Sequence, residues 1–205
     1  EPNGVAGRVF TAAARGKDSR GGVVFINDTE SDNFGKIVVS NGNALGIDLY
    51  DAALNHLGNY FKGDSRFNAG NAASTFRAGQ RDGIAYIVDW SDKGAGYWMF
   101  DPSDPTKLEN FLEGTKNSAG GHVVDGKVIG GGATDVAFVG KGDDCKMITY
   151  VEDITPANSL VRYDIGSAKT WGKAPDKFYT SASGRLANTN VALAATDNGV
   201  FAAQV

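Results

Sequence analysis

The clearest pattern in the sequence is TDVAFVGKGDDCKMITYVEDITPANSLVRYDI, residues 134–165. Three runs within it, 134–140, 146–152 and 159–165, are rich in β-branched and aromatic residues. Clusters of Gly, Asp, Asn and Pro separate these runs. Short runs of this composition between turn-forming residues are typical of β-strands. The stretch therefore predicts consecutive strands joined by turns.

Similar runs recur along the rest of the chain. They lie at 8–13, 23–27, 36–41, 46–51, 57–61, 73–78, 84–90, 96–101, 108–113, 122–130, 177–181, 190–196 and 199–205. Apolar residues at helical spacing are nearly absent, and the nearest case, residues 50–61, is flanked by strand-like runs. Many short strands between turns predict an all-β fold of the sandwich, barrel or propeller kind.

Three segments of the chain also align with one another, at 36–61, 84–113 and 147–179. Each contains an apolar strand, a polar turn, a strand that ends in an aromatic residue followed by Asp, a second turn and an edge strand. The aromatic-Asp steps are Tyr50-Asp51, Phe100-Asp101 and Tyr163-Asp164. A further strand candidate precedes each segment, at Val23, Ser74 and Thr134. Repetition of a four-stranded unit favours a propeller over a sandwich or barrel.

With these repeats the chain resembles β-propeller proteins over nearly its whole length, most clearly in residues 134–165. The resemblance implies an all-β, propeller-like single domain over residues 1–205, with about three to four four-stranded antiparallel blades. The approximate blades are 22–62, 72–114 and 133–182, with a last one formed by 188–205 plus 8–14. Two arrangements stay open: a self-contained ring closed by a terminal strand, or an incomplete piece that a second copy completes as a homodimer.

A looser likeness, to the β-propeller phytases, lies between Lys36 and Asp101. It is carried by SNGNALGIDLYD, FNAGNAASTFRAG and IAYIVDWSDKGAGYWMFDP. That family implies calcium-binding acids, and the matching turn of this chain, residues 68–73, contains no acidic residue. The alternative function implied by this likeness is a calcium-dependent hydrolase or lyase. Its acids and base would be Asp89, His122, Glu152 and Asp153, at the mouth of the central channel of the propeller.

Charge and composition exclude other classes of protein. The 205 residues include 24 acids and 20 bases, for a net charge of −4, and form no basic stripe. Nucleic acid is therefore not an expected partner. Membrane spanning is not expected either, because no apolar run approaches about 20 residues. The chain starts at Glu1 without an initiator methionine and uses few Lys and Glu, from which we expect a processed, secreted protein.

The residue types that most often carry catalysis or zinc are few. The single cysteine, Cys145, follows two aspartates. Neighbouring acids raise a thiol pKa, so Cys145 is not expected to be a nucleophile. His56 and His122 lie far apart in sequence without the spacing of a zinc site, and structural or exposed roles are expected for them.

One acidic loop, residues 28–33, has the composition of a metal site. Asp28, Glu30 and Asp32 place carboxylates at alternate positions, and calcium prefers carboxylate oxygens. The loop lacks the glycine and the terminal glutamate of an EF-hand loop, and a solvated hairpin loop is the alternative interpretation. Calcium at these residues is the only cofactor considered; otherwise none is expected.

In a propeller, the loops joining the second strand to the third and each last strand to the next blade share one face, where binding residues concentrate. The candidate ligand-binding residues on them are Asp64, Arg66, Asn68, Asn71, Asp89, Trp90, Asp92, His122, Glu152, Asp153, Arg185 and Asn188. Amide, carboxylate and guanidinium groups beside a tryptophan suit hydrogen bonding to sugar hydroxyls or to a peptide. The sequence therefore predicts a non-enzymatic recognition or scaffold module that binds carbohydrate or protein.

Overall fold

The computed structural model describes strands, turns and loops, and the part of the chain that it describes contains no α-helix. The described residues are 21–41, 46–64, 76–89, 96–110, 115–116, 122–124, 127–130, 132–140, 144–152, 159–164, 177–180, 191–196 and 199–204. The all-β prediction is confirmed, since these residues form several antiparallel sheets. In these ranges no helix is long and apolar enough to cross a membrane.

The first sheet is four-stranded and antiparallel, in the order β1-β2-β3-β4. Its strands are β1 (Gly21–Phe25), β2 (Ile37–Asn41), β3 (Gly46–Tyr50) and β4 (His56–Tyr60). Successive side chains of a strand point to opposite faces. Val38, Ile47 and Leu49 therefore share one face, and all three are buried. Val39 and Asp48 lie on the opposite face.

The second sheet repeats this order as β5-β6-β7-β8. Its strands are β5 (Phe76–Arg81), β6 (Ile84–Asp89), β7 (Gly96–Phe100) and β8 (Glu109–Asn110). Asp82 and Gly83 join β5 to β6 with φ angles of 51° and 74°, which suit the two-residue hairpin turn that requires left-handed backbone. Because this turn pairs Arg81 with Ile84, β5 continues to Arg81, beyond the predicted end at residue 78.

The third four-stranded sheet has the order β12-β13-β14-β15. Its strands are β12 (Gly132–Val139), β13 (Lys146–Glu152), β14 (Ser159–Asp164) and β15 (Lys177–Thr180). A two-stranded sheet follows, made of β16 (Val191–Thr196) and β17 (Gly199–Gln204). A three-stranded sheet contains β9 (Thr115–Lys116), β10 (His122–Val124) and β11 (Lys127–Gly130). The run 122–130, expected to be extended throughout, is thus a hairpin.

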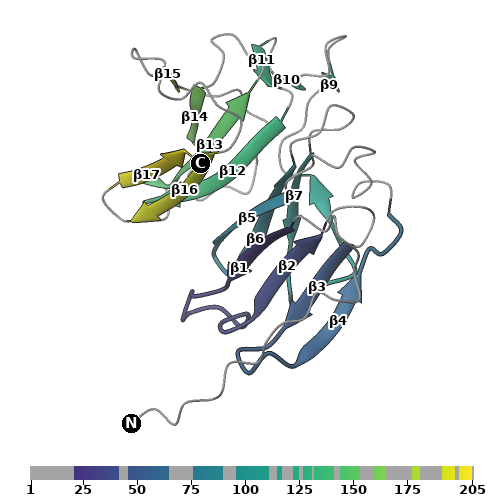
Figure 1. Ribbon diagram of the computed structural model, residues 1–205. Helices are drawn as coiled ribbons and strands as arrows, with labels where there is room; N and C mark the ends of the chain where they lie inside the picture. Colours follow the sequence, from purple (N-terminus) through teal and green to yellow (C-terminus); the bar gives the residue numbers. More distant parts are fainter. Residues whose placement is uncertain are drawn as a thin grey trace.

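The sheets that begin with β1, β5, β12 and β16 follow one another in space in the order in which they occur in the chain, whereas the β9–β11 sheet lies outside this row and contacts β13 through β11 (Figure 1). β5 lies beside β1 on one side and beside β12 on the other, and β12 lies beside β16. The first strand of each of these sheets therefore contacts the first strand of the next.

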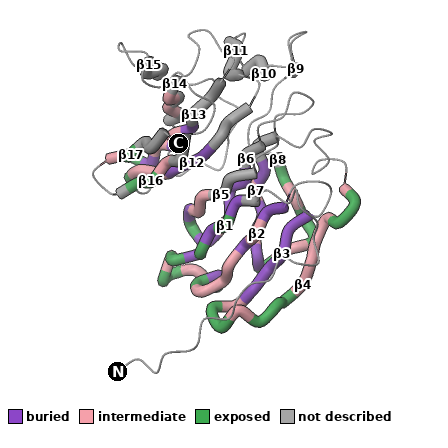
Figure 2. The backbone as a smooth tube through the Cα atoms, viewed as in Figure 1, coloured by how far each residue is buried: buried purple, intermediate pink, exposed green. Residues whose placement is uncertain are grey.

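The largest core lies between the first and second sheets. It consists of Val24, Ile26, Val38, Ile47, Leu49, Ala85, Ile87, Trp98 and Phe100. Figure 2 shows these buried segments along β1, β2, β3, β6 and β7, with exposed segments on β4, in the loops and at alternate residues of β1. On the other side of the second sheet, the rings of Tyr86 and Phe138 lie 4.7 Å apart. The second sheet is therefore packed between the first and the third.

Candidate functional site

Most of the residues expected to bind a ligand lie outside the described residues. These are Arg66, Asn68, Asn71, Trp90, Asp92, Asp153, Arg185 and Asn188. The backbone is described for Asp89 at the end of β6, His122 at the start of β10 and Glu152 at the end of β13. Asp64 follows β4, is half-buried, and bonds through its backbone N–H to the carbonyl of Phe61 at 3.1 Å. Sugar or peptide binding by the predicted face stays a prediction, as does catalysis at the channel mouth.

The acidic loop proposed for calcium is described in full. Oδ1 of Asp28 accepts a hydrogen bond from the backbone N–H of Glu30 at 3.1 Å, the Asx-turn geometry that aspartate favours in loops. Glu30 and Asp32 are exposed. Among the described residues no group of three or more His, Cys, Asp or Glu side chains could hold a metal ion. Calcium binding by this loop stays a prediction.

The same loop carries a buried amide that joins the first sheet to the second. Nδ2 of Asn33 donates to the carbonyl of Gly83 at 3.0 Å and to Oδ1 of Asp101 at 2.9 Å. Its Oδ1 accepts from Nζ of Lys36 at 2.7 Å. Gly83 has no room for a side chain, since an added Cβ would lie 1.8 Å from Oγ of Ser31. The loop after β1 is thus fastened to the β5–β6 turn and to the end of β7.

Replacing Asn33 with alanine is expected to lower the free energy of unfolding by about 2 kcal/mol, because buried hydrogen-bonding groups lose their partner. Chemical denaturation followed by tryptophan fluorescence measures this loss. The exposed Thr29 of the same loop is the control, and Thr29→Ala should change stability by less than about 0.5 kcal/mol. Equal stability of the two variants would contradict a clamping role for Asn33.

We call the hydrogen bonds of Asn33 to Gly83 and Asp101 the Asn33 clamp. A shallow pocket of about 170 Å³ lies next to this clamp, at the same end of the second sheet. Its lining residues are Ile84, Met99, Asp101, Asp104, Lys107 and Glu109. Ile84 begins β6 and Met99 lies near the end of β7, so the two strands supply the apolar part of the lining. The charged residues come from the loop after β7 and from β8, whose Glu109 pairs with Met99.

Two successive turns shape the charged side of the pocket. Oδ1 of Asp101 accepts from the backbone N–H and from the hydroxyl of Ser103, at 2.8 and 2.7 Å. Oδ1 of Asp104 accepts from the Thr106 hydroxyl at 3.0 Å, and Oδ2 lies 2.6 Å from Nζ of Lys107. Aspartate side chains that bond the loop in this way hold it in a defined shape.

These contacts favour the charged forms of Asp104 and Lys107. Hydrogen bonds from Lys107 and Thr106 lower the pKa of Asp104, and the Asp104 carboxylate raises the pKa of Lys107. The lining thus contains the carboxylates of Asp101, Asp104 and Glu109 against one ammonium group. Such a lining favours a cationic ligand group with an apolar stem.

A second polar cluster lies on the face of the first sheet that points away from the second. Asp48 is buried and accepts hydrogen bonds from Nδ2 of Asn41 and Nδ2 of Asn59, each at 2.9 Å. Nε2 of His56 lies 3.0 Å from Oδ1 of Asp48, and its ring centroid lies 4.9 Å from that of Tyr50. These hydrogen bonds replace the water that the buried Asp48 carboxylate has lost, as burial of a charge requires. His56 thus contacts the buried carboxylate from a half-exposed position.

Cys145 is buried, and burial raises the pKa of its thiol. The pKa of Tyr86 is also raised by burial. Burial thus disfavours the thiolate of Cys145, the form that nucleophilic attack requires.

The pocket next to the Asn33 clamp was not anticipated as a site. Of its charged residues only Asp101 belongs to a sequence pattern described above, the Phe100-Asp101 step. The signal that could have found it is the run Asp101 to Lys107, DPSDPTK, which places two turn-forming aspartates three residues apart directly after a strand. The apolar side of the pocket comes from β6 and β7, which no local pattern links to this loop.

The fold places this chain among all-β proteins made of antiparallel sheets. Comparisons with protein-family models, with curated proteins and with solved structures find no match for it.

Proposed function

We propose that the three four-stranded sheets are successive blades of a propeller-like arrangement, and that β16 and β17 belong to a further blade. Two observations support this. The sheets share one strand order and antiparallel pairing, and the first strands β1, β5, β12 and β16 contact one another in sequence. The aromatic residues Tyr50, Phe100 and Tyr163 also recur in register, each paired with a residue at the start of the second strand of its sheet.

On this scaffold we propose a non-enzymatic recognition module whose ligand is a basic segment of another protein. The observation that carries the proposal is the pocket beside β8, with Ile84 and Met99 as its apolar side and three carboxylates on its charged side. A lysine or arginine side chain combines an aliphatic stem with a cationic head, so it matches both parts. The pocket lies at the opposite end of the sheets from the loops that the sequence favoured.

The experiment is an NMR titration of the 205-residue chain with tetralysine, with tetraglutamate and maltotetraose as comparison ligands. Tetralysine should produce saturable shifts at residues 101–109 that weaken as salt is raised. Glu109→Gln and Asp104→Asn should each weaken binding about 1.4- to fivefold, the range that exposed ion pairs of about 0.2–1 kcal/mol allow.

Glu30→Gln provides the matched control, because Glu30 is exposed, carries the same charge and lies outside the pocket. It should leave the affinity for tetralysine unchanged. Equal weakening by Glu30→Gln would reduce the effect to overall charge and contradict the pocket. Saturable shifts with maltotetraose alone would favour carbohydrate as the ligand in place of a basic segment.

A further inference from the structure

The face of the first sheet that points away from the second carries, beside the Asp48 cluster, an apolar patch on β1 and β2 that no described part of the chain covers. The side chains of Val23, Phe25 and Phe34 are 65%, 46% and 52% exposed. The rings of Phe25 and Phe34 lie 6.4 Å apart in an edge-to-face contact. Register places Val23 beside Val39 and Phe25 beside Ile37, so these side chains form rows across β1 and β2. Contiguous apolar surface of this kind marks a site of protein contact.

The second sheet shows what covers such a face. Ile37 and Tyr50 pair in the first sheet as Ala85 and Phe100 pair in the second. By the same register, Val39 of the first sheet corresponds to Ile87 of the second, and Asp48 to Trp98. In the second sheet Ala85, Ile87, Trp98 and Phe100 are buried, since the preceding sheet packs on them. The face with Val23 and Phe25 is thus the one that receives a preceding sheet.

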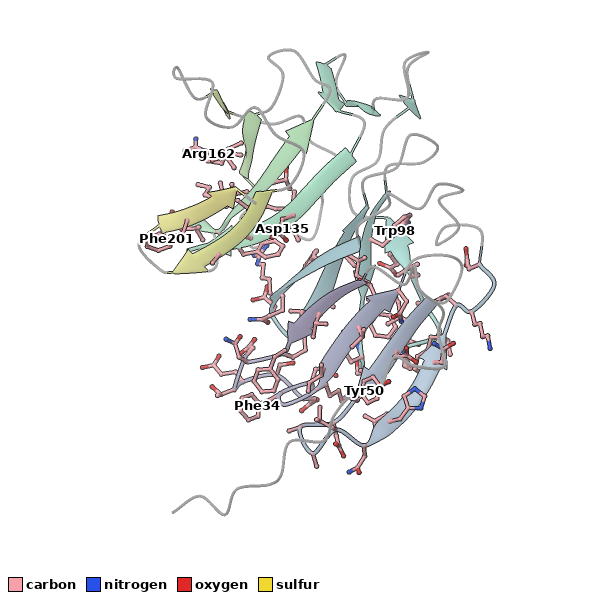
Figure 3. All side chains as sticks on the ribbon, in the orientation of Figure 1. Phe34, Tyr50, Trp98, Asp135, Arg162 and Phe201 are labelled. Carbon is pink, nitrogen blue, oxygen red and sulfur yellow. The ribbon has the colours of Figure 1, made fainter. Side chains whose placement is uncertain are left out.

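The β16–β17 sheet has the complementary open face. Phe201 is 67% exposed, and its strand partner Ala194 is exposed as well (Figure 3, where Phe201 and Phe34 are labelled). Leu193, which alternates with Ala194, is half-buried, and its backbone N–H donates to Oδ2 of Asp135 on β12 at 2.7 Å. One face of the β16–β17 sheet therefore lies against the third sheet, and the face with Phe201 points away from the third sheet.

We propose that a second copy of this chain covers both open faces. The β16–β17 sheet of each copy packs with its Phe201 face on the Val23 and Phe25 face of the other copy, so a two-fold axis generates two identical junctions. This inference rests on the proposed succession of blades and is independent of the pocket beside β8. The occupant is specified by the protein's own sheet-to-sheet contacts, in which each of these sheets packs on the one before it.

Light scattering on a size-exclusion column over a dilution series tests the proposal. The expected mass is twice the chain mass of 21.5 kDa. Phe25→Asp and Phe201→Asp should each raise the dissociation constant of the dimer at least about tenfold, because each buries a charge in one face of the junction. Val23→Asp should act as Phe25→Asp does, so the result does not depend on the folding of one variant. Leu57→Asp, at an exposed leucine of β4, should leave the dimer unchanged.

Mixing the two phenylalanine variants gives the sharpest result. A Phe25→Asp copy keeps its Phe201 face, and a Phe201→Asp copy keeps its Phe25 face, so one junction survives in the mixture. The mixture should therefore form a dimer although each variant alone is a monomer. A monomeric wild-type chain would overturn the proposal. So would a Phe201→Asp chain that dimerises as the wild type does, since the first sheet would then pair with itself.

Discussion

Phe100→Ala is expected to lower the free energy of unfolding by about 3–5 kcal/mol, the usual cost of removing a buried phenylalanine. Phe100 is fully buried in the core between the first and second sheets, and it is the largest of the fully buried side chains in the described residues. Its ring centroid lies 6.1 Å from that of Tyr60 and 6.4 Å from that of Phe61. Alanine would leave a cavity that touches both sheets. Urea denaturation followed by tryptophan fluorescence measures the loss.

The control for this change is Leu57→Ala, since Leu57 is an exposed apolar residue on β4. Its removal should cost less than about 1 kcal/mol, because little apolar surface leaves a packed environment. Equal losses for the two variants would mean that the junction between the first and second sheets is not the core of the protein.

Gly46→Ala is expected to lower the free energy of unfolding by about 3 kcal/mol or more, because backbone strain and overpacking add. Gly46 starts β3 with φ of 73°, a left-handed conformation. A Cβ there would lie 2.1 Å from the backbone carbonyl oxygen of Tyr60 and 2.8 Å from the backbone nitrogen of Lys62. Backbone atoms of a paired strand cannot turn aside as a side chain can. Thermal unfolding followed by circular dichroism measures the effect.

Gly63→Ala separates the two contributions to that loss. Gly63 also has a left-handed conformation, with φ of 83°, but a Cβ there would meet nothing within 4 Å. The variant should therefore lose only the cost of the left-handed backbone, about 1–2 kcal/mol. A loss as large as that of Gly46→Ala would mean that the close approach of β4 to Gly46 does not exist.

Strand positions followed closely from local pattern. Runs such as 36–41, 46–51 and 146–152 became β2, β3 and β13, because β-branched and aromatic residues between turn formers favour extended backbone whatever their partners are. β5 differed at its end, which lies at Arg81 instead of residue 78; residues 73–75 of the predicted run lie outside the described residues. Its last residues are Gln80 and Arg81, which pair with Ala85 and Ile84 because the Asp82-Gly83 turn joins β5 directly to β6.

Candidate site residues were harder to find. Asn33 had been noted only within a loop considered for calcium, yet its amide bonds to Gly83 and Asp101, which lie 50 and 68 residues further along the chain. Likewise the pocket joins Ile84 to Glu109 across the second sheet. Periodicity within a strand reports which face a residue occupies, and it contains no information on which loop of another strand lies beside it.

The sequence by itself determined the class of the fold and the places of most strands and turns. These depend on the conformational preferences of neighbouring residues and on alternation along each strand, both of which are local. Only the tertiary structure decided that β5 lies between β1 and β12, that Asn33 fastens the first sheet to the second, and that an acidic pocket forms beside β8. Those features depend on contacts between residues far apart in the chain, and packing in three dimensions selects such contacts.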